Sequence, residues 1–114
     1  MRDERERLLD ILEAIECIEK YMAQGKGAFY ADELIQNWMV SHIMVIGEAC
    51  RALPRDFQAR YANIPWADII GMRNILIHHY FGIDEDAVWS VVEKDIPELK
   101  FNIEIILKSL DDSP

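Results

Sequence analysis

The sequence has few of the features that mark membrane-spanning, secreted or disordered proteins. No apolar run approaches the roughly 18 residues that a membrane-spanning helix needs. The first seven residues carry charges of both signs and lead into an amphipathic pattern instead of a signal-peptide core. Only four prolines and five glycines occur in 114 residues, and 51% of the chain is hydrophobic. We therefore expect a cytoplasmic protein without membrane contact, folded as a single domain over residues 1–114.

Residue patterns that bind metals or form disulfides are also missing. Cys17 and Cys50 fit none of the metal-binding or redox spacings, and we interpret both as inert core thiols. The adjacent His78 and His79 would point apart on a helix, and no His-Glu-x-x-His pattern completes a metal site. The sequence thus predicts no metal and no cofactor.

The net charge of −9 argues at first against a polyanionic partner, because carboxylates repel phosphate. Residues 49–82 are the exception, since their four basic residues outnumber two acidic ones and give a formal charge of +2. These six residues are Arg51, Arg55, Arg60, Arg73, Asp56 and Asp68. All four cations are arginines, which suit bidentate phosphate binding. The segment is either an ordinary solvated surface or a local anion-binding site.

Helical periodicity dominates the first half of the chain. Apolar residues recur at intervals of three and four from about residue 5 to 22, which predicts an amphipathic helix. A second helix is predicted from an N-cap at Asp32 to Leu53, before Pro54. No Asp, Glu, Lys or Arg occurs between residues 34 and 47. This stretch predicts burial on more than one side, at the centre of a bundle or under a second subunit.

The second half predicts two more helices. Pro65 suits the first turn of a third helix, and Gly82 would end it in the left-handed conformation, with His78 in the last turn or just beyond. A fourth helix is predicted from an N-cap at Asp84 to about residue 110, kinked near Pro97. Without strand signals, the predicted fold is an all-α, antiparallel four-helix bundle. We expect a homodimer that uses part of the uncharged helix, around Trp38, Met39, Ile43 and Ile46.

One stretch, residues 71–82, combines polar and apolar residues in an unusual way. On a helix that turns about 100° per residue, Asn74 and His78 share one stripe, while Arg73 and Tyr80 lie on the neighbouring one. Arg73 and His78 would point about 140° apart on an ideal helix. The long Arg73 side chain, or a second subunit, is therefore needed to bring both groups to one substrate.

This stretch resembles the Arg-x4-His-x-Tyr motif of HepT-like toxins, a family of the HEPN superfamily. Arg73, Asn74, His78 and Tyr80 occupy the motif positions. The likeness covers most of the chain and includes Ile46-Gly47-Glu48-Ala49, Trp66 with Ile69-Ile70-Gly71-Met72, Tyr80-Phe81-Gly82-Ile83-Asp84, and Ile96-Pro97-Glu98-Leu99.

The resemblance implies a homodimeric, metal-independent ribonuclease toxin of a type VII-like toxin–antitoxin pair. It implies a minimal nucleotidyltransferase (MntA-like) antitoxin that adenylylates the motif tyrosine, Tyr80. Arg73 and His78 take the catalytic positions, and His79 is a secondary candidate because HEPN spacings allow a longer gap. The alternative is a non-catalytic HEPN module that binds nucleotide or RNA beside a nucleotidyltransferase. A scaffold has no need for an acid–base group, so the retained motif favours the ribonuclease.

The chemistry of RNA cleavage agrees with this interpretation. The 2′-OH is the nucleophile, so cleavage needs a base, a proton donor for the leaving oxygen and a cation for the phosphate. His78 would be the acid or base, Arg73 would bind the phosphate, and Asn74 would orient His78 or donate to the substrate. Two His78 side chains across a dimer cleft would supply both acid and base.

Some of these residues also have structural interpretations. Glu48 is either a surface residue, a structural partner of Arg73 or a supporting group of the site. Tyr80 could anchor the turn with its hydroxyl satisfied by a hydrogen bond. His42, inside the uncharged helix, is interpreted as structural.

Overall fold

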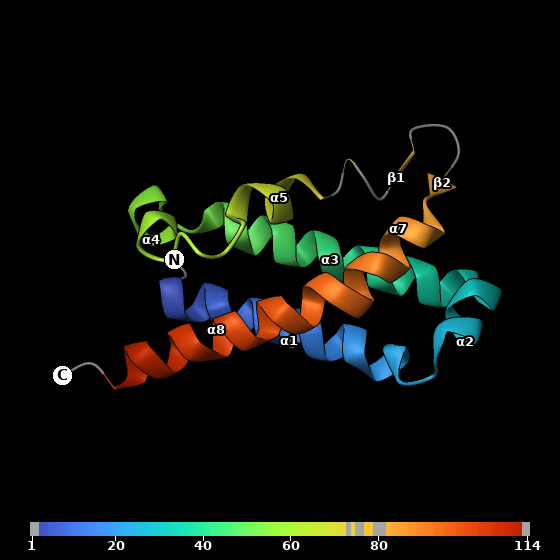
Figure 1. The fold of residues 1–114 in the computed structure, drawn as a ribbon, viewed down its shortest axis with the longest axis horizontal. Helices are drawn as coiled ribbons and strands as arrows, with labels where there is room; N and C mark the ends of the chain where they lie inside the picture. The colour runs from blue at the N-terminus through green and yellow to red at the C-terminus, as the bar shows by residue number, and fades with distance from the viewer. Residues whose placement is uncertain (1–2, 73, 75–76, 79–81, 113–114) are drawn as a thin grey trace.

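The computed structural model describes residues 3–72, 74, 77–78 and 82–112, and Figure 1 shows their arrangement. The chain is almost entirely helical, which confirms the all-α prediction. The elements are α1 (Glu4–Met22), α2 (Lys26–Ala31), α3 (Glu33–Ala52), α4 (Arg55–Arg60), α5 (Trp66–Gly71), β1 (Ile77–His78), β2 (Gly82–Ile83), α7 (Glu85–Ser90), the π-helix η1 (Val91–Asp95) and α8 (Ile96–Asp111).

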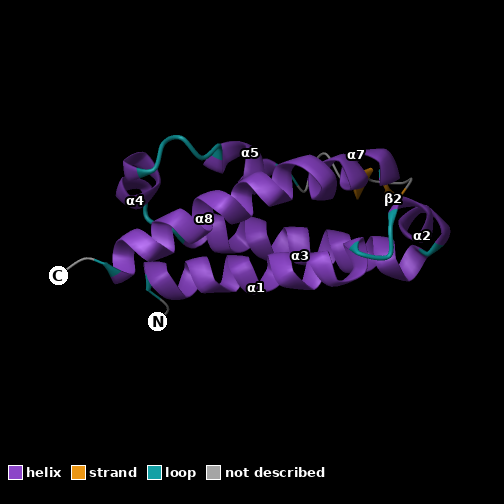
Figure 2. Ribbon diagram, turned by 60° about the horizontal axis from the view of Figure 1, so that its bottom comes forward, coloured by secondary structure: helices purple, strands orange, loops and turns teal. Residues whose placement is uncertain are grey.

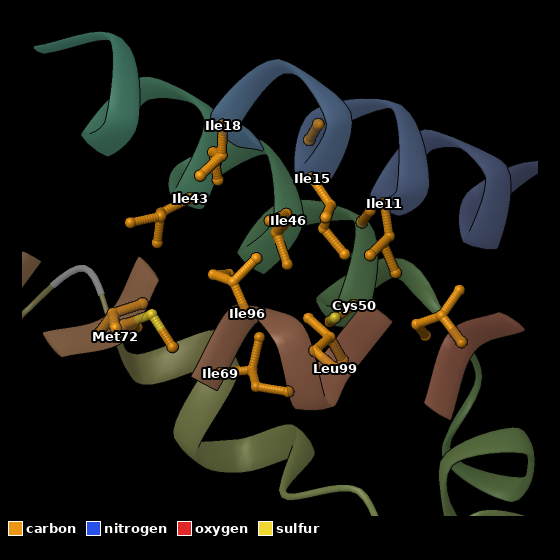
Figure 3. Packing of buried hydrophobic residues seen from close by; sticks show 14 of the residues in the cluster. Ile11, Ile15, Ile18, Ile43, Ile46, Cys50, Ile69, Met72, Ile96 and Leu99 are labelled. Atoms are coloured by element: carbon orange, nitrogen blue, oxygen red, sulfur yellow. The ribbon is translucent and has the colours of Figure 1, made fainter. Parts of the chain in front are cut away.

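Four helical segments alternate in direction along the molecule. Helices α1 and α3 pack against each other along their length, α8 lies against α1, and the short α5 lies against α3 (Figures 1 and 2). Isoleucines from α1, α3, α5 and α8 meet in one core, in which Ile15 is fully buried and Ile46 is 1% exposed (Figure 3). Burial of these apolar faces is the main stabilising contribution to the fold.

Side-chain caps fix where three helices begin. The Asp3 carboxylate accepts a hydrogen bond from the backbone N–H of Glu6 at 2.8 Å. Asp32 accepts from Leu34 at 2.9 Å before α3, and Asp84 accepts from the backbone N–H of Ala87 at 3.1 Å. Each cap satisfies a donor that would lack a helical partner. The N-caps predicted at Asp32 and Asp84 are confirmed.

A short helix that the sequence did not predict, α2, lies between α1 and α3. Gly25, with a φ of +92°, turns the chain between α1 and α2. Phe29 of α2 is 1% exposed, with its ring centroid 5.3 Å from that of Trp89 in α7. Burial of Phe29 therefore attaches α2 to the α7 end of the bundle.

The connector between residues 54 and 64 contains a second unpredicted helix, α4. Its Phe57 is 3% exposed, and the neighbouring Tyr61 packs against the same core. The indole N–H of Trp66 donates to the carbonyls of Gln58 and Tyr61, both at 3.1 Å. Phe57 and Tyr61 thus anchor the connector to the core, and Trp66 holds the start of α5 against them.

The last helix changes its hydrogen bonding where a kink at Pro97 was predicted. Residues 91–95 are π-helical, and the backbone N–H of Ile96 donates to the carbonyl of Val91, five residues back. A π-helical turn is one way to accommodate a proline within a continuous helix. Helices α7 and α8 are therefore joined without a loop, whereas the kink itself stays a prediction.

The third helix is shorter than predicted, and this changes the environment of the polar stretch. Helix α5 ends at Gly71, and Ile77–His78 form a strand that pairs antiparallel with Gly82–Ile83. Of the two places expected for His78, the last helical turn is therefore wrong, and His78 lies in a strand beyond the helix. β-branched Ile77 and Ile83 favour the extended conformation, and Gly82, with a φ of +79°, enters the second strand instead of capping a helix.

The uncharged part of α3 is mostly buried within one chain. Met39, Ile43 and Ile46 are at most 2% exposed, so these predicted dimer residues belong to the monomer core. Trp38 is partly buried, and its indole N–H donates to the carbonyl of Cys17 at 2.6 Å. Leu34 and Val45 are the residues of this helix that expose apolar side chains, at 79% and 47%.

Tyr30 joins α2 to α7 at the end of the bundle that leads into the hairpin. Its hydroxyl donates to the Asp86 carboxylate at 2.5 Å, and this hydrogen bond raises the pKa of Tyr30 to about 12. Asp86 lies three residues beyond β2, which pairs with the strand that contains His78. The contact therefore ties the base of the hairpin to α2.

We expect Tyr30→Phe to lower the thermal stability of the protein at neutral pH. The Tyr30 hydroxyl has a higher pKa in the folded protein than in the unfolded chain, where it is 10.0. Its hydrogen bond therefore stabilises the folded state fully below pH 10.0, and this stabilisation is lost as the pH rises toward about 12. Thermal melts of wild type and Tyr30→Phe should therefore differ at pH 8 and converge above pH 10. An equal difference at every pH would contradict a role for the ionisable hydroxyl.

Among the described residues, no helix is long and apolar enough to cross a membrane.

Candidate functional site

A groove runs between α3 and α5, next to the point where the polar stretch begins. The two helices lie close together at Gly47, where a Cβ would be in ordinary van der Waals contact, 3.5 Å from the carbonyl oxygen of Ile69. A side chain larger than alanine at this position would push α5 away. A small residue at position 47 therefore suits this spacing of α3 and α5.

This α3–α5 groove has a volume of about 290 Å³ and a mixed polar and apolar lining. Its lining residues are Ile43, Met44, Gly47, Glu48, Arg51, Ile69, Ile70, Gly71 and Asn74. Glu48, Arg51 and Asn74 are exposed and provide a carboxylate, a guanidinium and an amide. The groove can therefore both accept and donate hydrogen bonds.

Glu48 is a surface residue of α3, which agrees with one of its predicted interpretations. It lines the α3–α5 groove and also a shallower hollow of about 420 Å³ between α1 and α3, beside Arg7 and Asp10. An ion pair of Glu48 with Arg73 stays a prediction, because Arg73 lies outside the described residues.

The other motif residues are described only in part. Asn74 is in a helical conformation and shares the groove with Glu48. The backbone of His78 belongs to β1, whereas His79 and Tyr80 lie outside the described residues. The described structure thus brings Asn74 and Glu48 together, and it leaves the distance between Arg73 and His78 a prediction.

Another hollow, of about 200 Å³, lies between α5 and α8, and its charged lining residues are all acidic, whereas the α3–α5 groove has one acidic and one basic residue. Its floor is apolar, with Ile69 and Leu99, and its rim carries the carboxylates of Asp68, Asp95 and Glu98. Three carboxylates disfavour a phosphate. Of these two hollows, the α3–α5 groove is therefore the better candidate for an anionic ligand.

Two residues considered in the sequence analysis have structural roles. His42 Nδ1 lies 2.9 Å from the carbonyl oxygen of Trp38, and the two rings stack with centroids 4.4 Å apart. Burial raises the pKa of the Cys50 thiol to about 12, so that it is protonated at neutral pH and a poor nucleophile.

Within the described ranges, no group of three or more His, Cys, Asp or Glu residues could hold a metal ion.

Arg51 and Gly71 are groove residues that the motif did not indicate. The excess of arginine in residues 49–82 was a signal for Arg51, but the sequence did not show which arginine would line a groove. In the sequence, Gly71 belonged to the family resemblance and began the polar stretch, but nothing indicated that it would line a groove. Its position in the groove wall depends on how α5 packs against α3.

Comparison with known proteins identifies the class to which this fold and motif belong. A family model described as "Ribonuclease HepT-like" matches residues 11–106. The chain therefore belongs to the HepT-like ribonuclease family. No solved structure was found to match it.

Individual relatives agree with this family. The chain is 39% identical over 106 residues to a Methanocaldococcus jannaschii protein named "Putative RNase MJ1380", covering 92% of this chain and 97% of that protein. It is 38% identical to "Probable ribonuclease HepT" of Thermococcus cleftensis over 108 residues, covering 94% and 98%.

A further relative is a larger protein. The M. jannaschii protein "Gamma-glutamylcyclotransferase and putative RNase MJ0434" is 41% identical over 111 residues, which cover 96% of this chain and 50% of that protein. The chain thus spans about half the length of this relative.

Proposed function

We propose that this protein is a metal-independent endoribonuclease that acts as the toxin of a type VII-like toxin–antitoxin pair. One observation carries the proposal: a member of a ribonuclease family retains an arginine, Arg73, and a histidine, His78, at the motif spacing. These two residue types supply a phosphate-binding cation and a group that can exchange a proton near neutral pH.

The proposed reaction uses the RNA's own nucleophile. A neutral His78 takes the proton of the 2′-OH, and the 2′ oxygen attacks the adjacent phosphorus. The bond from phosphorus to the 5′ oxygen breaks, and that oxygen takes a proton from a protonated histidine. The products are a 2′,3′-cyclic phosphate and a 5′-hydroxyl end. Arg73 neutralises the charge that develops on the phosphate oxygens.

A site shared between two subunits would supply both histidine roles. Each chain contributes one His78, so a twofold dimer with its cleft at the motif provides one base and one acid. Asn74 would orient His78 or donate to the substrate. Glu48, exposed beside Asn74 in the groove, would support the same site, and His79 is the alternative acid–base group.

The dimer is a separate prediction. Because Met39, Ile43 and Ile46 are buried within the monomer, the interface must use other residues, and Leu34 and Val45 expose apolar side chains on α3. We expect light scattering of the purified protein at micromolar concentration to give the mass of two 13.3 kDa chains. A monomer mass would remove the basis for a shared pair of His78 groups.

Control of the toxin is proposed to act on Tyr80, two residues after His78. A minimal nucleotidyltransferase antitoxin would transfer adenylate from ATP: the tyrosine oxygen attacks the α-phosphorus, and pyrophosphate leaves. The bulky, anionic adenylate would then occupy the place of the substrate phosphate near Arg73.

The alternative function is a non-catalytic module that binds RNA or nucleotide beside a nucleotidyltransferase. The two functions separate in one experiment, in which purified protein is incubated with labelled RNA in EDTA and analysed for both binding and cleavage. Cleavage supports the ribonuclease. Binding of intact RNA without any cleavage, over protein concentrations that saturate binding, would favour the module.

A further inference from the structure

We propose that the α3–α5 groove binds the RNA strand beside the reacting phosphate, and that Arg51 holds a neighbouring phosphate of the same strand. This inference rests on the proposed function and assigns a substrate contact outside the Arg-x4-His-x-Tyr motif. Its basis is the position, exposure and charge of Arg51 in a groove that also contains Asn74.

Arg51 is available to a ligand. It lies in the last turn of α3 and is exposed. In the part of the chain that the structure describes, no carboxylate forms an ion pair with Arg51. A guanidinium has five donors in a planar fork, which matches two oxygens of a phosphate. An arginine of this kind in a groove next to a phosphate-cleaving motif is suited to bind the substrate's backbone.

The surroundings of Arg51 favour an anion more than the net charge of the protein suggests. Helix α4 follows directly and carries Arg55 at its start and Arg60 at its end. The Arg60 guanidinium lies 5.9 Å from the centre of the Phe57 ring, which limits its freedom. Three arginines thus follow one another in the sequence from the last turn of α3 to the end of α4, and the acidic residues of the same segment are Glu48 and Asp56. The segment from Glu48 to Arg60 therefore carries a formal charge of +1, opposite in sign to the −9 of the whole protein.

The groove is also kept open by residues without side chains. Gly47 and Gly71 both line it, one from each helix. A Cβ built on Gly71 meets no atom within 4 Å, so a side chain at this position has room without disturbing the packing of α5. A larger residue at position 71 should therefore obstruct the groove and leave the fold intact.

Glu48 shares the groove with Arg51 and bears the opposite charge. It lies three residues earlier on α3, one turn away, and both side chains are exposed. A carboxylate accepts hydrogen bonds but repels phosphate, so Glu48 suits a ribose hydroxyl or a base amino group. The groove thus has separate groups for the charged and the uncharged parts of one nucleotide.

A purely structural role for Arg51 is the competing explanation, because a cation in the last turn of a helix interacts favourably with the helix dipole. Lys108 has the same position in α8 and does not line the α3–α5 groove. The variants Arg51→Ala and Lys108→Ala remove one charge each from the same kind of site. They are therefore a matched pair that controls for both the dipole and the total charge.

The test measures binding of a short 2′-O-methyl RNA oligonucleotide, which the proposed reaction cannot cleave, at several salt concentrations. Loss of one phosphate contact should reduce the slope of log affinity against log salt by about 0.7, the value for one contact on a single strand. We expect this change for Arg51→Ala and an unchanged slope for Lys108→Ala. An unchanged slope for Arg51→Ala would overturn the assignment.

A second pair of variants tests the groove itself. Gly71→Leu should weaken binding of the same oligonucleotide by about tenfold or more, the equivalent of one good contact. Gly27→Leu adds the same side chain on α2, where a Cβ also meets no atom within 4 Å, and should bind like wild type. Circular dichroism and melting check that both variants fold. Wild-type affinity in a folded Gly71→Leu protein would place the RNA elsewhere.

These outcomes distinguish the inference from the proposed function. If wild-type protein neither binds nor cleaves RNA, the proposed function fails, and the groove assignment fails with it. If wild type cleaves RNA and Arg51→Ala binds with the wild-type affinity and salt dependence, only the groove assignment is overturned.

Discussion

His78→Ala and Arg73→Ala should each eliminate RNA cleavage in EDTA while the protein stays folded. Removal of a general acid or base typically costs 10²- to 10⁴-fold in rate, and loss of a group that stabilises the developing charge costs about 10²- to 10³-fold. The measurement is the initial rate of cleavage of a labelled RNA, together with circular dichroism and a thermal melt for each variant.

Two further variants make this result specific. Lys108→Ala, which removes a cation at the end of α8, should cleave at the wild-type rate. His79→Ala distinguishes the adjacent histidine, and it should retain most of the activity if His78 is the acid–base group. Undiminished cleavage by His78→Ala would move that role to His79, or would end the enzyme hypothesis if His79→Ala were also fully active.

Adenylylation of Tyr80 should abolish the activity as completely as the loss of His78. The modification adds a nucleotide and a negative charge two residues from His78 and seven residues from Arg73 in the sequence. Inhibition of this kind needs no refolding. We expect co-expression with a cognate nucleotidyltransferase to give protein that carries one adenylyl mass on the peptide containing Tyr80 and cleaves no RNA.

The matched variant for this prediction is Tyr80→Phe, which lacks only the hydroxyl. It should remain an active ribonuclease, and co-expression with the nucleotidyltransferase should not inhibit it. Tyr30→Phe removes a tyrosine hydroxyl at the base of the hairpin and serves as the control. The Tyr30 hydroxyl of the wild type is bound to Asp86, and this variant should still be adenylylated at Tyr80. Adenylyl mass found only on another peptide would contradict Tyr80 as the control point.

The sequence predicted the long helices because their signals are local. Asp32 and Asp84 lie directly before amphipathic runs, and a carboxylate there has backbone donors within two or three residues. Pro54 predicted the end of α3 for an equally local reason. The all-α class follows from such signals alone.

The hairpin and the short helices could not be predicted in the same way. Residues 75–78 read Ile-Leu-Ile-His, a pattern that fits a buried helix and a strand equally well. Pairing between Ile77 and Ile83 decides the conformation, and this pairing depends on where α7 holds the second strand. Helix α2 is stabilised by the burial of Phe29 against α7, a contact between residues 60 positions apart.

The sequence predicted the motif residues of the candidate site, but it did not predict the groove beside them. Arg73, His78 and Tyr80 were identified by the motif spacing, and Glu48 belonged to the Ile46-Gly47-Glu48-Ala49 resemblance. The groove that joins Glu48 to Asn74 and Arg51 forms where α5 packs closely against α3 at Gly47. Such an approach is a property of two packed helices and has no signature in either helix alone.

The ends of the cleaved RNA test the central claim most directly. Purified protein should be incubated in EDTA with an RNA oligonucleotide and with the same sequence lacking the 2′-OH groups, and the products should be analysed by mass spectrometry. The account predicts a 2′,3′-cyclic phosphate and a 5′-hydroxyl from the RNA, and an intact 2′-deoxy strand. Cleavage of the deoxy strand, or products with 5′-phosphate and 3′-hydroxyl ends, would contradict it.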